Sequence, residues 1–199
     1  MRTWAVIGLA ISLLTAAPTL AQSLNASDGE AFLKAVEQGD ASKALPLAQQ
    51  PGSRVVNYRG YSGNTALHIA VRNRELNWVG FLLKNKADPD IGDSKGDTPL
   101  ILAARIGFSE AASYLIRLGA KVDAANKRGE TALIVGVQQK RLQLVELLLK
   151  SGANPDKSDF AAGYSARDYA RRETRNPELL RLIETVKSTT KPAAGPKLN

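Results

Sequence analysis

The side chains that could do acid–base or metal chemistry are few and widely spaced in this sequence. His68 is the only histidine among 199 residues, and there is no cysteine. A thiolate nucleophile, a disulfide and a multi-histidine metal site are therefore excluded. No set of base, nucleophile and orienting acid surrounds His68, so nucleophilic catalysis has no candidate residues. We expect His68 to be structural, and we predict no catalytic residue, no metal site and no cofactor.

The carboxylates also lack the pattern of a catalytic pair. The candidates fall mostly at predicted turns, namely Asp93, Asp97, Asp123 and Asp156. Glycoside hydrolysis needs two carboxyl groups at a fixed short distance within a cleft, whereas turn aspartates more commonly bond their own backbone. The sequence also contains no glycine-rich loop that runs into Gly-Lys-Ser or Gly-Lys-Thr. It therefore favours a binding protein over an enzyme.

An internal repeat supplies the elements that position these residues. Gly63, Gly96 and Gly129 stand at equal intervals along the chain, and the strings that begin there are GNTALHIA, GDTPLILA and GETALIVG. A fourth string, GYSARDYA, begins at Gly163. The threonine at the third place of the first three strings suits a helix N-cap, and apolar residues then recur at helical spacing. One such unit cannot bury its apolar face alone, so neighbouring units must stack.

These strings resemble the ankyrin repeat, whose pattern reads G-x-T-P-L-H-x-A and later L-L-x-x-G-A. The resemblance covers residues 28–187 and implies an all-α solenoid of stacked helix–turn–helix units with projecting turns. We count five units: an N-terminal cap at 28–60, central units at 61–93, 94–126 and 127–158, and a C-terminal cap at 159–187. Two positions depart from the pattern, because Lys86 replaces a helix-ending glycine and Gly136 replaces a helix alanine.

The two ends of the chain differ from the repeats. After Arg2, an uncharged apolar run ends in small residues at Thr19 and Ala21, which is the layout of a secretory signal peptide cut after Ala21. An uncleaved membrane anchor is the alternative, but the run is short for a spanning helix. We therefore predict a signal peptide at 1–21, a linker at 22–27 and a disordered tail at 188–199. This layout favours an exported bacterial ankyrin-repeat protein located in the periplasm.

The charge of the chain indicates the kind of partner. The formal net charge is +8 and the pI is about 9.8, which favours an acidic partner. The resemblance implies that the partner is a protein, bound by the turn tips and the concave side of the first helices, and we expect the chain to be a monomer. Nucleic-acid binding is a weaker alternative, because no stacking platform or nucleic-acid motif is present. An accessory role to an envelope enzyme, or neutralisation of a toxin, stays open.

The resemblance also points to individual partner-binding residues. On the positions that match the ankyrin contact surface lie Tyr61, Asn64, Arg72, Lys95, Asp97, Arg105, Lys127, Arg128, Glu130, Gln138, Tyr164 and Arg172. Arginine and tyrosine are enriched in binding hot spots. We expect charge reversal at Lys127 and Arg128 to weaken partner binding without unfolding the protein.

Overall fold

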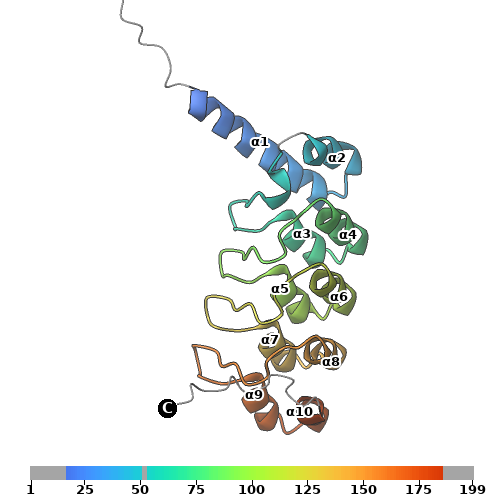
Figure 1. Ribbon diagram of the computed structural model, residues 1–199, viewed down its shortest axis with the longest axis vertical. Helices are drawn as coiled ribbons and strands as arrows, with labels where there is room; N and C mark the ends of the chain where they lie inside the picture. Colours follow the sequence, from blue (N-terminus) through green and yellow to red (C-terminus); the bar gives the residue numbers. More distant parts are fainter. Residues whose placement is uncertain (1–16, 51–52, 186–199) are drawn as a thin grey trace, which may run out of the picture.

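The computed structural model describes residues 17–50 and 53–185, and within these ranges every regular element is helical (Figure 1). The elements follow in the order α1 (Ala17–Glu37), α2 (Ala41–Gln49), the 3-10 helix η1 (Val55–Asn57), α3 (Ala66–Arg72), α4 (Leu76–Lys84), α5 (Pro99–Ile106), α6 (Ser109–Arg117), α7 (Ala132–Gln138), α8 (Leu142–Lys150), α9 (Ala166–Arg172) and α10 (Pro177–Thr185). The all-α solenoid expected from the sequence is confirmed.

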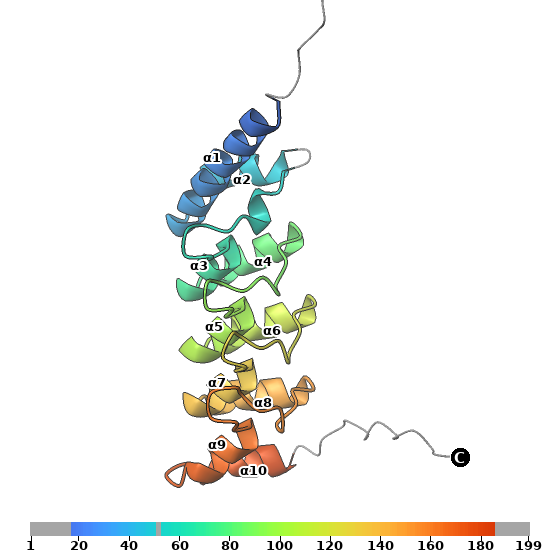
Figure 2. The same ribbon diagram turned by 90° about the vertical axis from the view of Figure 1, so that its left-hand side faces the viewer.

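Helices pair in chain order, and the pairs stack into one column (Figure 1). Inner helices α1, α3, α5, α7 and α9 contact one another in succession, and outer helices α4, α6, α8 and α10 do the same. Loops project from one side of the column ahead of α3, α5, α7 and α9, and Figure 2 shows them one above another on the side facing the viewer. The column therefore has a helical side and a looped side.

The N-terminal boundary differs from the predicted one. Residues 22–27, predicted to be a linker, lie inside α1, which runs without interruption from Ala17 to Glu37. The first part of the predicted signal peptide, residues 1–16, and the predicted tail at 188–199 lie outside the described residues.

The start of each central helix follows from local hydrogen bonds. Thr98 Oγ1 accepts from the N–H of Ile101 at 3.3 Å, and Thr131 Oγ1 accepts from the N–H of Ile134 at 3.3 Å. Each bond satisfies a donor that the first turn of a helix leaves free. Pro99 occupies the first turn of α5, where its missing N–H removes no helical bond. The predicted N-cap role of these two threonines is confirmed.

One continuous core runs along the column. Leu82, Leu115 and Leu148 occupy the same position of successive repeats on the outer helices, and all three are fully buried. The core extends from Phe32 in α1 to Ile183 in α10 without a break between units. Each unit therefore completes the apolar core of its neighbour.

Packing between α7 and α8 explains why glycine replaces the usual alanine at position 136. In the middle of α7, a Cβ on Gly136 would lie 3.2 Å from Leu144 Cδ2 and 3.3 Å from Val145 Cγ2. These methyl groups of α8 occupy the space that the usual alanine side chain would fill. The departure from the repeat pattern is thus matched by a close approach of α7 and α8.

Polar side chains tie each unit to the next. Asn57 Oδ1 accepts from the N–H of Asp88, Asp90 Oδ1 from Lys121, and Asp123 Oδ1 from Asn154, at 2.7–2.9 Å. The three acceptors hold the same position in successive units, so one bond is repeated at successive unit boundaries. The aspartate at this position was expected to bond its own turn, but Asp123 binds the following unit instead.

Candidate partner-binding surface

Four loops of similar shape carry most of the predicted binding residues. We call them fingers 1 to 4 and define them as residues 60–64, 93–97, 126–130 and 159–164. In each finger the N–H of the first residue donates to the C=O of the last residue, at 2.9–3.0 Å. Asp93 also accepts from the N–H groups of Lys95 and Asp97 within finger 2, at 2.8 and 3.0 Å. This bonding confirms that Asp93 is a turn aspartate that satisfies its own backbone.

Neighbouring fingers are joined by backbone hydrogen bonds. The N–H of Ser94 donates to Ser62, that of Lys127 to Lys95, and that of Phe160 to Arg128, at 2.8–3.1 Å. The fingers therefore form a continuous ladder along the looped side of the column.

Glycines make this close approach possible. Gly63, Gly96 and Gly129 have φ values of 72°, 79° and 78°. A Cβ at each would lie 2.6–2.9 Å from a backbone nitrogen of the next finger. The repeated glycine is thus needed both for its backbone conformation and for contact between fingers.

The structure divides the predicted binding residues by exposure. The exposed ones are Tyr61, Arg72, Lys95, Lys127, Arg128 and Arg172, and the half-buried ones are Asn64, Arg105, Gln138 and Tyr164. Two acids differ from the expectation of an exposed tip, because Asp97 is 5% exposed and Glu130 is 6% exposed. Both side chains are buried within the fingers, where they accept hydrogen bonds from a finger residue.

Asp97 and Glu130 belong to a buried polar cluster. Asn126 Nδ2 donates to Asp97 Oδ1 at 2.7 Å and to Glu130 Oε2 at 2.8 Å, so one amide bridges the two carboxylates. Arg105 Nη2 donates to Asp97 Oδ2 at 2.8 Å, and Arg128 Nη2 donates to Glu130 Oε2 at 2.7 Å. Each buried carboxylate therefore has its own guanidinium group, which offsets the cost of its desolvation.

Asn126 is the member of this cluster that the sequence prediction left out. Its Oδ1 accepts from the N–H groups of Arg128 and Glu130, as Asp93 accepts within finger 2. The same place in finger 4 is held by Asp159. The recurrence of Asp or Asn at the base of successive fingers was a signal in the sequence for this role.

His68 is bound on both ring nitrogens. Its Nδ1 accepts from the N–H of Thr65 at 3.2 Å, and its Nε2 lies 2.8 Å from the backbone oxygen of Asp97. A carbonyl only accepts, so Nε2 carries the proton and the ring is neutral. Burial lowers the pKa of His68 further. The ring ties α3 to finger 2, which confirms the predicted structural role.

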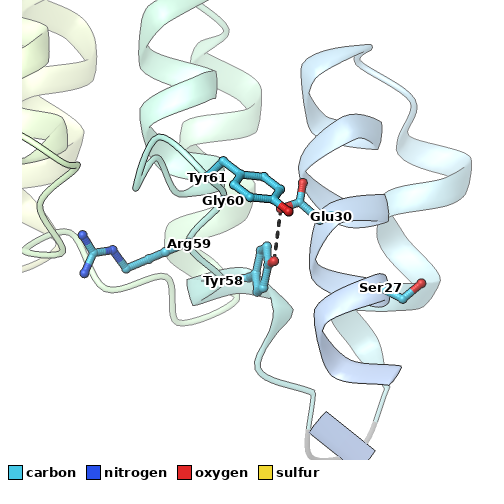
Figure 3. Close-up of a pocket in the computed structure, with 6 residues that line it drawn as sticks. All are labelled: Ser27, Glu30, Tyr58, Arg59, Gly60 and Tyr61. Atoms are coloured by element: carbon cyan, nitrogen blue, oxygen red, sulfur yellow. Dashed lines mark hydrogen bonds between the residues drawn. The ribbon is translucent and has the colours of Figure 1, made fainter. Parts of the chain in front are cut away.

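Finger 1 and α1 border an open hollow of about 430 Å³ (Figure 3). Tyr58 Oη donates to Glu30 Oε1 at 3.1 Å, and partial burial together with this bond raises the pKa of Tyr58. Tyr61 stands at the rim, and its side chain is fully exposed, at 105% of the reference area. Tyrosine is among the residues enriched in binding hot spots, so this ring is a candidate contact for a partner.

Aromatic and cationic side chains also meet at finger 4. The guanidinium carbon of Arg172 lies 4.1 Å from the centroid of the Tyr164 ring. Tyr164 in turn packs edge-on against Tyr169, with centroids 5.6 Å apart. The cation–π contact holds Arg172 in place at the end of α9.

Within residues 17–50 and 53–185, no group of three or more His, Asp or Glu side chains is arranged to hold a metal ion. Over the same described residues, no helix has both the length and the apolar character needed to cross a membrane.

Comparison with protein families agrees with this geometry. A model described as ankyrin repeats in three copies matches residues 77–159, and one described as ankyrin repeats in many copies matches residues 49–103. Together the two matches span more than half of the chain and include fingers 1 to 3. Ankyrin repeats generally mediate protein–protein interaction, and proteins built from them are typically not enzymes. The chain belongs to the ankyrin-repeat family.

Proposed function

We propose that this protein is an exported binding module that recognises an acidic protein surface through its fingers and the adjoining ends of its inner helices. The observation that supports this proposal most directly is the exposure of Lys95 and Lys127 and their lack of an acidic partner among the described residues. Both side chains are exposed, neither forms an ion pair with another described residue, and their backbones are bonded to each other across fingers 2 and 3. Two unpaired positive charges on the preformed ladder of fingers favour fast association with an acidic surface.

Two exposed arginines add positive charge on either side of these lysines along the column. Arg72 ends α3 and Arg172 ends α9, so they lie beyond the two lysines in opposite directions. Both side chains are exposed. The partner we propose would therefore carry acidic groups along an extended line.

The contacts of Arg128 decide which charges should be reversed in a test. Arg128 is bonded to buried Glu130, so its reversal would leave a buried carboxylate without its cation. The cleaner variant is therefore K95E/K127E. A control with the same change of charge is K84E/K150E, at the last residues of outer helices α4 and α8, where Lys150 has only an exposed ion pair with Glu146 to lose.

The experiment is affinity capture from the envelope fraction of the source cells with wild type and both variants. Acidic proteins should be retained by wild type and by K84E/K150E, and lost with K95E/K127E. Circular dichroism would verify that all three proteins are folded. Equal capture by K95E/K127E would show that Lys95 and Lys127 do not contribute to partner binding.

The proposed export and periplasmic location rest on the apolar N-terminal run and the small residues that end it. Mass spectrometry of the protein isolated from its own cells provides the test. A chain beginning at Gln22 in the periplasmic fraction supports the proposal. An intact Met1 or Arg2 terminus in the cytoplasmic fraction would contradict it.

A further inference from the structure

The polar cluster of fingers 2 and 3 opens into a hollow of about 380 Å³. The lining residues are all charged or polar: Lys95, Asp97, Arg105, Asn126, Lys127 and Arg128. Their charged and amide groups can recognise a ligand by charge and by hydrogen bonds.

Two guanidinium groups in this hollow are held in fixed positions by the acids behind them. Asp97 holds Arg105 through Nη2, and Glu130 holds Arg128 through Nε and Nη2 at 3.1 and 2.7 Å. The side chains of Arg105 and Arg128 nevertheless keep exposures of 34% and 61%. A guanidinium has five N–H donors, so each arginine retains donors beyond those that its acid uses. Donors oriented before binding lose little conformational entropy when a ligand arrives.

The hollow is also positively charged. The carboxylates of Asp97 and Glu130 offset the charges of Arg105 and Arg128, and the charges of the two rim lysines are not offset by any described residue. The bond from the N–H of Lys127 to the C=O of Lys95, at 3.1 Å, fixes the two sides of the rim relative to each other. The hollow therefore suits an anion that accepts hydrogen bonds from planar, paired donors, as a carboxylate does.

We propose that this hollow binds an aspartate or glutamate side chain from an extended acidic segment of the partner protein. The carboxylate of that side chain accepts from Arg105 and Arg128, and its acidic neighbours along the segment pair with Lys95 and Lys127. The exposed charges of Arg72 and Arg172, at the ends of α3 and α9, continue beyond the hollow in both directions along the column, which matches several single charges on an extended chain better than one compact polyanion. This inference rests on the proposed function and names the site and the ligand group for it.

Fluorescence anisotropy with labelled hexaglutamate at low ionic strength tests the inference on the full chain. We expect K95A/K127A to weaken binding by about tenfold, from the loss of two exposed ion pairs. K84A/K150A removes the same charge from the outer helices and should weaken binding much less, since those charges act on the probe only over a long distance. R105K keeps the charge and the ion pair with Asp97 but loses the planar fork, so it should weaken binding by about threefold or more.

Inorganic phosphate at matched ionic strength distinguishes a peptide site from a small-anion site. Excess unlabelled hexaglutamate should displace the probe, and phosphate should not. The inference is overturned if phosphate displaces the probe equally well, if hexaglutamate does not bind, or if K84A/K150A weakens binding as much as K95A/K127A. Unchanged affinity in a folded R105K variant would equally remove the proposed contact with Arg105.

Failure of this inference can be told apart from failure of the proposed function. One outcome is that hexaglutamate fails to bind while acidic proteins are still captured by wild type and lost with K95E/K127E. In that case fingers 2 and 3 bind the partner without the proposed carboxylate contact in the hollow. If capture is also insensitive to K95E/K127E, the proposed function itself is wrong.

Discussion

Replacement of Lys86 by glycine should stabilise the protein, because Lys86 has a left-handed backbone conformation with φ of 64°. The matching residues of the next two units are Gly119 and Gly152, with φ of 102° and 87°. A Cβ at either glycine would meet nothing within 4 Å. Lys86 is therefore disfavoured by its own backbone geometry and not by a lack of space around the side chain.

The size of the effect follows from two opposing contributions. A left-handed conformation costs a residue with a Cβ about 1–2 kcal/mol. Glycine gives the unfolded chain extra freedom, which is worth about 0.4–1 kcal/mol in the other direction. K86G should thus raise the free energy of unfolding by about 0.5–1 kcal/mol and raise Tm by about 2 °C. The backbone bonds of Lys86 to Leu83 and Asn57 do not involve the replaced side chain and are retained.

Urea unfolding followed by circular dichroism measures this change. K86A removes the charge and most of the side chain but keeps the Cβ, so its stability should equal that of wild type. G119K makes the reverse change one unit later and should lose a similar amount of free energy. If K86G and K86A were equally stable, the backbone argument would be wrong, and any gain would come from removing the lysine charge.

Three further predictions concern single side chains. N126A should lower the free energy of unfolding by about 1–3 kcal/mol, because two carboxylates and two backbone N–H groups lose a partner; urea unfolding checks this, and a neutral result would contradict the bridging role. His68 has a folded-state pKa below its unfolded value, so stability should fall as pH drops from about 7 to 5.5, where only the unfolded chain gains a proton. H68Q should flatten that part of the curve in unfolding measured against pH, and an unaltered slope would exclude His68 as its source. Y61A should weaken binding of a captured partner by about tenfold with no change in Tm, since the ring is fully exposed; unchanged affinity by surface plasmon resonance would remove Tyr61 from the interface.

The fold was predictable because it depends on residues that recur with one period. Leu67, Leu100 and Leu133 could be read as core positions from their spacing, and all three are at most 1% exposed. Gly63 and its equivalents could be placed at turns, although their contact with the next finger could not be foreseen. A residue's neighbours in the adjacent unit lie a full repeat away along the chain, and a pattern within one unit says nothing of them.

The same limit explains why the acids in the fingers were misjudged. Asp97 was expected at an exposed tip because turn residues are usually exposed. Its burial depends on Arg105, in the helix that follows its own finger, and on Asn126 in the next finger. Neither contact follows from helical or turn periodicity, because each depends on how the fingers and helices pack in space. Lys95 and Lys127 were correctly predicted to be exposed. No acid among the described residues forms an ion pair with either side chain.

The bonds that hold the fingers together also orient the arginines, so finger stability and ligand affinity should be coupled. Asn126 bridges Asp97 and Glu130, and these two acids position Arg105 and Arg128. Loss of the Asn126 side chain would remove the bridge between the two acids and so loosen the positions of both guanidinium groups, without removing any charge from the hollow. N126A should therefore weaken hexaglutamate binding even at temperatures where the protein is fully folded, whereas K86G should change stability alone. Unchanged affinity in folded N126A would mean that Arg105 and Arg128 bind the acidic segment without being held in position beforehand.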